Sequence, residues 1–532
     1  MTDHRPLPDA LLSQLSEFVA ARLGLHFPPA RWRDLERGLR LAALDFGFDD
    51  MEACARWLNS SPLTRRHLET LAGRLTVGET YFFRDRGTFE ILETRVLPDL
   101  ITERRACGER RLRLWIAGCC TGEEPYSLAI LLSRLIPDWD DWNVTLLATD
   151  INPVFLQKAV EGVYGEWSFR STPAWVKEGY FRKIAAGRYE ILPYFRRRVT
   201  FAYHNLAGDP YPALLNNTNA MDVILCRNVL MYFAPERTRQ VAQNFHRALA
   251  DGGWLIVSPS ETSQSLFSQF AAVNFTDAIL YRKDAHAPQP ARDALILPLV
   301  DAPAASLLPS QLTSPNLSPS PPPQPSAAPV SGGDDGGSGF PASVRESGGG
   351  MMEDAFTLYR RGRYTEAADS ALALLAQYPA DASMLGLLAR IYANQGRLSE
   401  ALAWCDRAIA ADRLNSSGHY LRATILLESS RPKEALVSLR RTLYLDPDFA
   451  LAHYTLGDLT RRHGRERETG KHWQNALALL RDRPPDEPLS EAEGLTAGRL
   501  AEIIQQQTAF IGRRPKVLRS IFDRGPTFGK QP

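Results

Sequence analysis

The chain of 532 residues lacks the features by which membrane, secreted and metal-binding proteins are most easily recognised. It has no run of eighteen apolar residues, and its first ten residues are polar, so we expect neither a transmembrane helix nor a signal peptide. Its six cysteines are scattered without the C-x-x-C spacing of a metal site, so we expect no bound metal. A reducing, cytoplasmic location is the default expectation.

The sequence also has little excess charge of either sign. Lysine and arginine together number 62 and aspartate and glutamate 61, a formal net charge of +1 at pH 7. We therefore expect no overall attraction to nucleic acid and no association with a membrane. Hydrophobic residues make up 44% of the chain, as in ordinary globular proteins, and the length predicts more than one domain.

The most informative stretch is residues 112–127, with the sequence LRLWIAGCCTGEEPYS. An apolar run ends at a loop with two glycines, Gly118 and Gly122, and a segment of helical character follows. A strand, loop and helix of this kind form the nucleotide-binding end of a βαβ unit. The loop has no phosphate-binding pattern, and Glu123 and Glu124 would repel a pyrophosphate. A cation such as the sulfonium of S-adenosylmethionine fits better; the alternative is a turn that binds nothing.

A second candidate lies one βα unit further along the chain. Residues 143–150, NVTLLATD, are predicted to be a buried strand that ends on Asp150. An acid at this place can accept hydrogen bonds from ribose hydroxyls, which together with the first loop indicates a nucleoside ligand. The alternative is that Asp150 only caps a helix that starts near Asn152.

Residues 1–85 are predicted to form an N-terminal helical domain. In the segment 31–43 the apolar side chains lie on one helical face, and three arginines, Arg33, Arg37 and Arg40, lie on the opposite face. A solvated charged face is one interpretation of this pattern. A docking surface for an acidic partner is the other.

Residues 86–284 alternate between strands and helices, which predicts a parallel sheet with helices on both faces. Further strands are expected at 198–203, 221–226, 254–258 and 278–282. The connection that precedes residue 198 is long for a simple crossover, and residues 187–192 are predicted to belong to a small inserted hairpin.

Residues 285–350 change in character and include SPSPPPQPSAAP and SGGDDGGSGF. A segment so rich in proline, serine and glycine cannot bury enough apolar surface to fold, so we expect a disordered linker. We therefore expect the parts on its two sides to be tethered without rigid docking. A ligand for a domain that binds proline-rich peptides is an alternative.

Residues 351–484 contain an internal repeat. Small residues recur every 34 positions, at Gly362, Gly396, Ser430 and Gly464. A 34-residue period with a small residue between paired helices is typical of tetratricopeptide (TPR) repeats, which stack into an all-α solenoid with a concave groove. Residues 485–532 are then a capping helix and a basic tail. The groove is expected to hold a protein or peptide that the sequence does not identify.

Five segments resemble signatures of the CheR family of chemoreceptor methyltransferases. They are LTVGETYFFR at 75–84, GEEPYS at 122–127, ATDIN at 148–152, HNL at 204–206 and CRNVLMYF at 226–233. Their order makes the resemblance, which covers residues 10–284, far more specific than one motif. It implies a Rossmann-like class I S-adenosylmethionine methyltransferase domain after a small all-α domain. It also implies a small β-subdomain near the predicted hairpin, which in some members grips a receptor tail peptide.

The resemblance implies a protein-glutamate O-methyltransferase that acts on methyl-accepting receptors and leaves S-adenosyl-L-homocysteine as product. A glutamate with a pKa near ~4.3 is already ionised, so the chemistry needs alignment and removal of water more than a general base. By resemblance, Arg84 is the first choice for orienting the carboxylate, and Tyr232 is the second choice, as a hydrogen-bonding group near the sulfonium or the carboxylate. The family's N-terminal helices face the receptor, which favours Arg33, Arg37 and Arg40 as substrate-docking residues.

The cofactor contacts that the resemblance implies come from the same motifs: Gly78, Thr80, Arg84, Glu123, Asp150, Asn205, Leu206, Arg227 and Asn228. Among them, Asp150 would hold the ribose, and Asn205 and Leu206 would flank the adenine. Gly78 stands where the better-known enteric members have asparagine, so only its backbone is available for a contact.

Two functions of different classes follow. The first is an enzyme that methylates receptor glutamates, with TPR repeats that recruit a partner or regulate it. The second is a TPR scaffold of a chemosensory-like pathway that binds S-adenosylmethionine without turnover. The intact TYFFR, GEEPYS and RNVLMYF motifs favour the enzyme.

Overall fold

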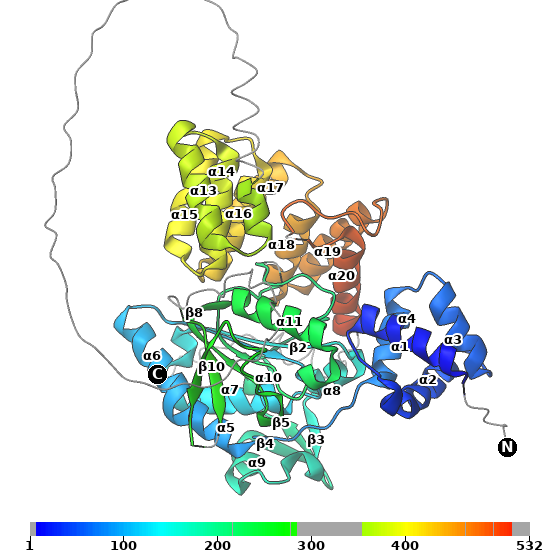
Figure 1. Cartoon of the computed structure of the whole chain (residues 1–532). Helices are drawn as coiled ribbons and strands as arrows, with labels where there is room; N and C mark the ends of the chain where they lie inside the picture. The colour runs from blue at the N-terminus through cyan, green and yellow to red at the C-terminus, as the bar shows by residue number, and fades with distance from the viewer. Residues whose placement is uncertain are drawn as a thin grey trace, which may run out of the picture.

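The computed structural model describes residues 7–214, 216–276, 278–284, 354–462, 464–492 and 494–512. Within them the chain forms an N-terminal helical unit, a central unit built on a sheet and an array of paired helices (Figure 1). The predicted linker and basic tail lie outside the described residues. No helix of the described part is long and apolar enough to cross a membrane.

The N-terminal unit contains α1 (Asp9–Leu23), α2 (Trp32–Phe46), α3 (Met51–Ser60) and α4 (Arg65–Leu75), which share one apolar core. Helix α2 is the predicted amphipathic helix: Leu35 and Leu39 are fully buried, whereas the three arginines of its other face are exposed. After α1 the chain turns at Gly24, where φ is +77° and an added Cβ would lie 2.5 Å from the Cβ of Ala207. This close approach brings the unit against the central one.

The described residues of the central unit form a seven-stranded sheet in the order β6-β2-β1-β7-β8-β10-β9. The strands are β1 (Arg111–Ala117), β2 (Asn143–Asp150), β6 (Thr200–Tyr203), β7 (Met221–Leu225), β8 (Leu249–Ile256), β9 (Ala271–Asn274) and β10 (Ile279–Arg282). From β6 to β8 neighbouring strands are parallel, whereas β10 is antiparallel to both β8 and β9. The predicted parallel sheet is thus confirmed, and β9 is the strand that the sequence pattern missed.

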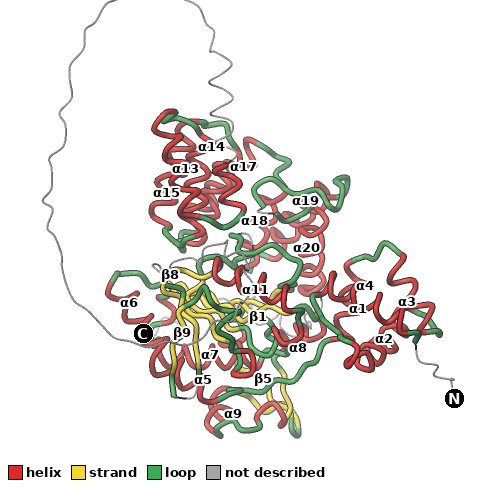
Figure 2. The backbone as a smooth tube through the Cα atoms, in the orientation of Figure 1, coloured by secondary structure: helices red, strands yellow, loops and turns green. Residues whose placement is uncertain are grey.

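Helices cover both faces of this sheet (Figure 2). They are α5 (Arg86–Ile91), α6 (Leu97–Ala106), α7 (Glu123–Leu135), α8 (Pro153–Glu161) and α11 (Pro235–Ala248), with a π-helical turn between α5 and α6. Strand β1 shows why two layers are needed, because its alternate residues enter different cores. Leu114 and Ile116 pack with α7, and Trp115 packs against Phe245 of α11.

A second, three-stranded sheet is inserted between α8 and β6, in the order β3-β5-β4. Its elements are β3 (Val163–Gly165), α9 (Ala174–Tyr180), β4 (Phe181–Ala185), β5 (Arg188–Ile191) and α10 (Pro193–Arg196). The predicted hairpin is therefore present as β4 and β5. The ring of Phe82 lies 4.9 Å from Tyr164 and 5.0 Å from Phe169, so the insertion holds the TYFFR segment in place.

The array contains α13 (Tyr364–Gln377), α14 (Ala382–Asn394), α15 (Leu398–Ala411), α16 (Ser416–Glu428), α17 (Pro432–Leu445), α18 (Ala450–Arg462), α19 (Glu466–Leu480) and α20 (Ala497–Gly512). The repeated small residues form the turns between paired helices. Gly362, Gly396 and Gly464 have φ between +72° and +79°, and Ser430 has φ +56°. Glycine takes this left-handed backbone without strain, which explains the 34-residue period. The predicted TPR solenoid is confirmed.

The arginine after each turn pairs with the glutamate three residues later: Arg363–Glu366, Arg397–Glu400, Arg431–Glu434 and Arg465–Glu468. These pairs are exposed, so each contributes only about 0–1 kcal/mol to stability. The packing of the repeat depends instead on the alanine that follows the glutamate. Ala367, Ala401 and Ala435 are completely buried, where a larger side chain would separate the paired helices.

The array lies directly against the central unit, so the expectation that the tethered parts are not docked is wrong. Arg113 Nη1 of β1 donates to Glu428 Oε2 of α16 at 2.6 Å, and Asn143 Nδ2 donates to the carbonyl oxygen of Glu428 at 3.0 Å. Leu214, in the loop before β7, packs into an apolar cluster of α14, α15 and α16. The composition of a linker does not determine which surfaces of the two linked parts meet. It is therefore a poor guide to whether they dock.

Candidate functional site

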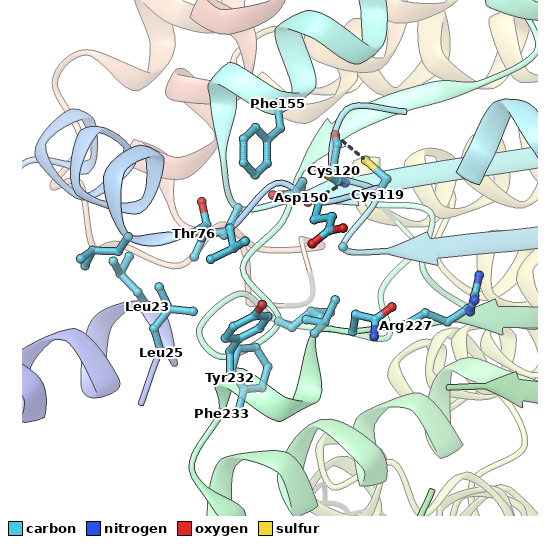
Figure 3. A pocket seen from close by; sticks show the side chains of 18 of the residues that line it. Leu23, Leu25, Thr76, Cys119, Cys120, Asp150, Phe155, Arg227, Tyr232 and Phe233 are labelled. Carbon is cyan, nitrogen blue, oxygen red and sulfur yellow. Dashed lines mark hydrogen bonds between the residues drawn. The ribbon is translucent and has the colours of Figure 1, made fainter. Parts of the chain in front are cut away.

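A cavity opens at the carboxyl ends of β1, β2 and β6, where they face the N-terminal unit. Its empty space amounts to about 1010 Å³, part of which is open solvent at its mouth. In Figure 3, Asp150 and Cys120 lie on one side, Tyr232 and Phe233 on the facing side, and Leu23 and Leu25 of the N-terminal unit close a third side. The carboxyl edge of the strands is where ligands bind in open α/β sheets.

Asp150 lines this cavity at the end of β2 and is buried. Its Oδ2 accepts a hydrogen bond from Cys120 N at 2.8 Å, and its Oδ1 accepts one from Asn152 N at 2.8 Å. The cap of α8 is Asn152, whose Oδ1 accepts from Val154 N at 2.9 Å. Asp150 therefore joins the glycine loop of β1 to the end of β2 and is not the cap of the following helix.

The two acids of the GEEPYS segment have different surroundings. Glu123, the predicted contact, accepts hydrogen bonds from Thr121 Oγ1 at 2.6 Å and Ser168 Oγ at 2.9 Å, and it is not among the residues that line the cavity. Glu124 lines the cavity and accepts from Arg227 Nη1 at 2.7 Å. Burial raises the pKa of Glu124, and Arg227 opposes that effect.

Arg227 and Asn228 also line the cavity, from the loop that follows β7. This loop is held by Glu261, whose Oε2 accepts from Asn228 N and Oε1 from Val229 N, both at 2.8 Å. Sequence reasoning did not select Glu261. The signal was the segment SPSE at 258–261, a Ser-x-x-Glu capping box that the structure forms.

His204, Asn205 and Leu206 line the side of the cavity next to β6. The amide of Asn205 is already engaged, because its Nδ2 donates to Arg22 O and its Oδ1 accepts from Ala207 N, both at 3.0 Å. His204 is buried, and burial lowers its pKa, so the ring is neutral at pH 7. Its Nε2 is buried and has no hydrogen-bond partner among the described residues, and the ring centre lies 5.6 Å from that of Trp115 and 5.1 Å from that of Tyr211.

Arg84 lines the cavity from a turn with unusual backbone. Its neighbours Phe83 and Asp85 have φ of +55° and +64°, and strain of this kind concentrates at functional sites. The Nη1 of Arg84 donates to the carbonyl oxygen of Glu79 at 2.6 Å. Thr80, from the same segment, lines the cavity as well.

Tyr232 lines the cavity beside two residues that sequence reasoning did not select, His26 and Arg31. The guanidinium carbon of Arg31 lies 5.5 Å from the centre of the Tyr232 ring and 5.0 Å from that of Phe27. Arg31 stands directly before α2 and pairs with Asp34 at 3.4 Å, and Arg37 of the exposed basic face pairs with the same Asp34 at 3.0 Å, so one cluster of ion pairs leads from that face to the cavity. The position of Arg31, three residues before the acid Asp34, is the signal that could have identified it.

The remaining predicted residues lie outside the cavity wall. Gly78 does not line it, but an added Cβ there would lie 2.5 Å from the ring of Phe155, which does. A side chain at position 78 would therefore displace part of the wall. Arg33, Arg37 and Arg40 are exposed on α2, and Arg37 pairs with Asp34 at 3.0 Å.

The lining chemistry fits S-adenosylmethionine. Asp150 offers acceptors for ribose hydroxyls, and Leu206 and Phe233 supply apolar surface for a base. Acidic side chains in the wall suit a positively charged sulfur. No group of three or more metal-ligating side chains occurs in the described part of the chain.

Comparisons with known proteins agree with this site. A sequence model described as CheR methyltransferase, SAM binding domain, matches residues 78–279, and a tetratricopeptide repeat model matches residues 357–416. The chain is 34% identical to Chemotaxis protein methyltransferase 2 of Vibrio cholerae, over 41% of this chain and 73% of that protein. It is 35% identical to Chemotaxis protein methyltransferase 1 of Pseudomonas aeruginosa, over 40% of this chain and 77% of that protein.

Among solved structures, MamA from Desulfovibrio magneticus aligns with 26% of this chain and 77% of its own, at 16% identity. The TM-score of 0.24 is too low to support any conclusion about this chain.

Proposed function

This chain belongs to the CheR family of S-adenosylmethionine-dependent chemotaxis methyltransferases, and on that premise we propose that it esterifies glutamate side chains in the cytoplasmic domain of a methyl-accepting receptor. The observation that carries the proposal is the meeting of two surfaces at Arg31. The cavity that has Asp150 in its wall is also lined by Arg31, which shares the partner Asp34 with Arg37 of the exposed basic face of α2. A receptor helix bound to that face would hold its glutamate at the mouth of the cavity.

When bound, S-adenosylmethionine supplies an electrophilic methyl group on a positively charged sulfur. The residues of the chain hold the ribose at Asp150 and orient the incoming carboxylate with Arg84 and Tyr232. The hydrogen bond from Arg84 to the carbonyl oxygen of Glu79 limits how strongly its charge can quench the nucleophile. The apolar walls from the N-terminal unit remove water from a carboxylate that needs no general base.

The test is methyl transfer from radiolabelled S-adenosylmethionine to purified receptor cytoplasmic domains. We expect label on glutamate that base releases as methanol, and we expect none when the acceptor glutamates are replaced by alanine. Asp150→Asn should reduce the labelling at limiting cofactor, whereas Glu434→Gln, in an exposed pair of the array, should not. Label that resists base would contradict ester formation.

We further propose that the helical array recruits a protein partner and that the enzyme works in the cytoplasm. The support is the repeat architecture, together with large apolar side chains that the central unit leaves exposed. Leu414, Val437 and Tyr444 have exposed fractions of 76%, 66% and 77%. The double change Val437→Glu and Tyr444→Glu should raise the receptor concentration needed for half-maximal methylation in a mixture with the partner and leave the maximal rate unchanged.

A further inference from the structure

Helix α20 contacts both other units at once. Glu502 Oε2 accepts a hydrogen bond from Arg65 Nη1 of α4 at 2.7 Å. One turn away, Arg499 Nη2 donates to Asp209 Oδ2 at 3.3 Å and to the carbonyl oxygen of Tyr203 at 3.4 Å. The Tyr203 ring lies 3.9 Å from the guanidinium of Arg65 and 4.8 Å from that of Arg499, so the three units meet around it. Figure 1 shows α20 at the end of the array, next to the N-terminal helices.

Each contact leads to a wall of the cofactor cavity. The oxygen of Asp209 that accepts from Arg499 also accepts from Asn205 N at 2.8 Å, and residues 204–206 line the cavity. Arg65 is the first residue of α4, and that helix ends at Leu75, which lines the cavity with Thr76. Helix α20 thus contacts a support of the β6 wall and the start of the helix that carries another part of the cavity wall.

These contacts are partly sheltered from water, although the side chain of Glu502 is 34% exposed. The side chains of Arg65 and Arg499 are each 14% exposed, and that of Asp209 is 21% exposed. Charged groups interact more strongly where solvent is largely excluded than on an open surface. Arg65 also pairs with Glu69 of its own helix, which fixes the guanidinium in the orientation that reaches Glu502.

The same helix is built into the array. Ala497, Leu500 and Ile504 are buried in a cluster with residues of α18 and α19, and Gln507 Nε2 donates to the hydroxyl of Tyr454 at 3.4 Å. Because α20 is packed on this side, a shift of the last repeats would move Arg499 and Glu502 with it.

We propose that α20 is a strut between the two walls of the cofactor cavity, and that Arg499 and Glu502 are positioning residues for S-adenosylmethionine binding. The array then controls cofactor affinity directly, and a protein bound to the last repeats can tighten or loosen the cavity. This control concerns the cofactor alone, so it stands apart from which receptor the enzyme methylates.

The test is calorimetric titration of the full-length chain with S-adenosylmethionine and with S-adenosylhomocysteine, without receptor. Glu502→Gln and Arg499→Ala should each weaken both ligands by about five- to twentyfold, within the usual range of coupling between sites. Arg499→Lys should restore part of the loss. Glu434→Gln lies in an exposed pair within the array and should bind as the unchanged protein does.

A double-mutant cycle separates positioning from general stability. If Arg65 and Glu502 act through their mutual contact, the pair Arg65→Ala with Glu502→Ala should weaken binding by clearly less than the product of the two single effects. Hydrogen exchange of α4 and of residues 204–209 should quicken in cofactor-free Glu502→Gln. In methylation assays the KM for the cofactor should rise while kcat at saturation is retained.

Unchanged cofactor affinity in folded Glu502→Gln and Arg499→Ala would overturn the proposal that α20 positions the cavity walls. So would a loss of kcat with no change in KM, which would assign these residues to general stability. If the variants weaken cofactor binding as expected but the unchanged protein methylates no receptor, the proposed function is wrong and the role of α20 stands.

Discussion

Asp150 combines burial with an ionisable group that faces a ligand site. Burial raises its pKa to about 6, although hydrogen bonds from the N–H groups of Asn152 and Cys120 act in the opposite direction. The folded protein therefore holds this proton more tightly than the unfolded chain, whose carboxyl has an ordinary pKa of 3.8. Folding stability is consequently lost as the pH rises from about 4 to 6, because ionisation costs more in the folded state.

Cofactor affinity should change in the opposite sense, because the ionised carboxylate is the stronger acceptor for ribose hydroxyls. We expect S-adenosylmethionine to bind about tenfold more weakly at pH 5 than at pH 7 if only the ionised form binds. Calorimetry across this range checks the profile, and Asp150→Asn should flatten it. Asp150→Ala should cost about 1.5–3 kcal/mol of binding free energy at pH 7. A slope that persists in Asp150→Asn would assign the titration to another group.

Glu123 and Glu124 show that the sequence did not predict which of two neighbouring acids lines the cavity. The family motif places both acids at the start of α7, and the resemblance selected Glu123. The backbone at Gly122, with φ +96°, sets the direction in which the helix leaves the loop, and Glu124 is the acid that reaches the cavity. A one-residue difference of this kind is decided by rotation about the helix axis, which sequence spacing does not determine.

At the scale of elements, the backbone of the loop after β7 is held by the carboxylate of Glu261. Glu261→Gln keeps the shape of the side chain and removes the charge that accepts from Asn228 N and Val229 N. We expect a loss of about 1–3 kcal/mol in unfolding free energy, measured by urea denaturation, and weaker cofactor binding as the loop loosens. Glu236→Gln, in a weak exposed pair at the start of α11, is the control and should change neither quantity.

The exposed face of α2 gives a second prediction at this scale. Changing Arg33, Arg37 and Arg40 together to glutamate should raise the receptor concentration required for methylation and leave cofactor affinity unchanged. Turnover of the unchanged protein should fall with added salt, because exposed charges are screened beyond about 8–10 Å near physiological ionic strength. Arg56→Glu on α3 is the control, and an unaltered receptor titration in the triple variant would mean that the α2 face is only solvated.

The elements themselves were largely predictable, because apolar runs such as residues 112–117 and 143–150 have few other ways to be buried. Strand β9 was missed because it is short and only half-buried, at the edge of the sheet. Arg113 interrupts the apolar run of β1, and its partner Glu428 lies more than 300 positions away. Contacts at that separation are fixed by how whole units dock, so no local pattern announces them.

For the molecule as a whole, removing the ion pair between Arg113 and Glu428 tests how firmly the array docks on the central unit. Arg113 is only 2% exposed, and burial lowers its pKa to about 10 despite the nearby Glu428. Glu428→Gln should destabilise the folded protein by about 3–5 kcal/mol, the range for a buried charge that loses its partner. Urea denaturation measures the loss, and limited proteolysis should then release the array. Glu400→Gln, in an exposed pair, should have neither effect.

Two turns of the array also meet the central unit closely. An added Cβ at Gly362 would lie 2.0 Å from Arg247 Cδ, and one at Gly396 would lie 3.1 Å from Ala220 Cβ, while α20 reaches Asp209 from the far end of the stack. The number of repeats therefore sets the distance from the first docked turn to the last helix. Solenoids commonly tolerate the gain or loss of a repeat, but in this chain either change would carry α20 past its contacts. Repeat number therefore decides where α20 meets the central unit.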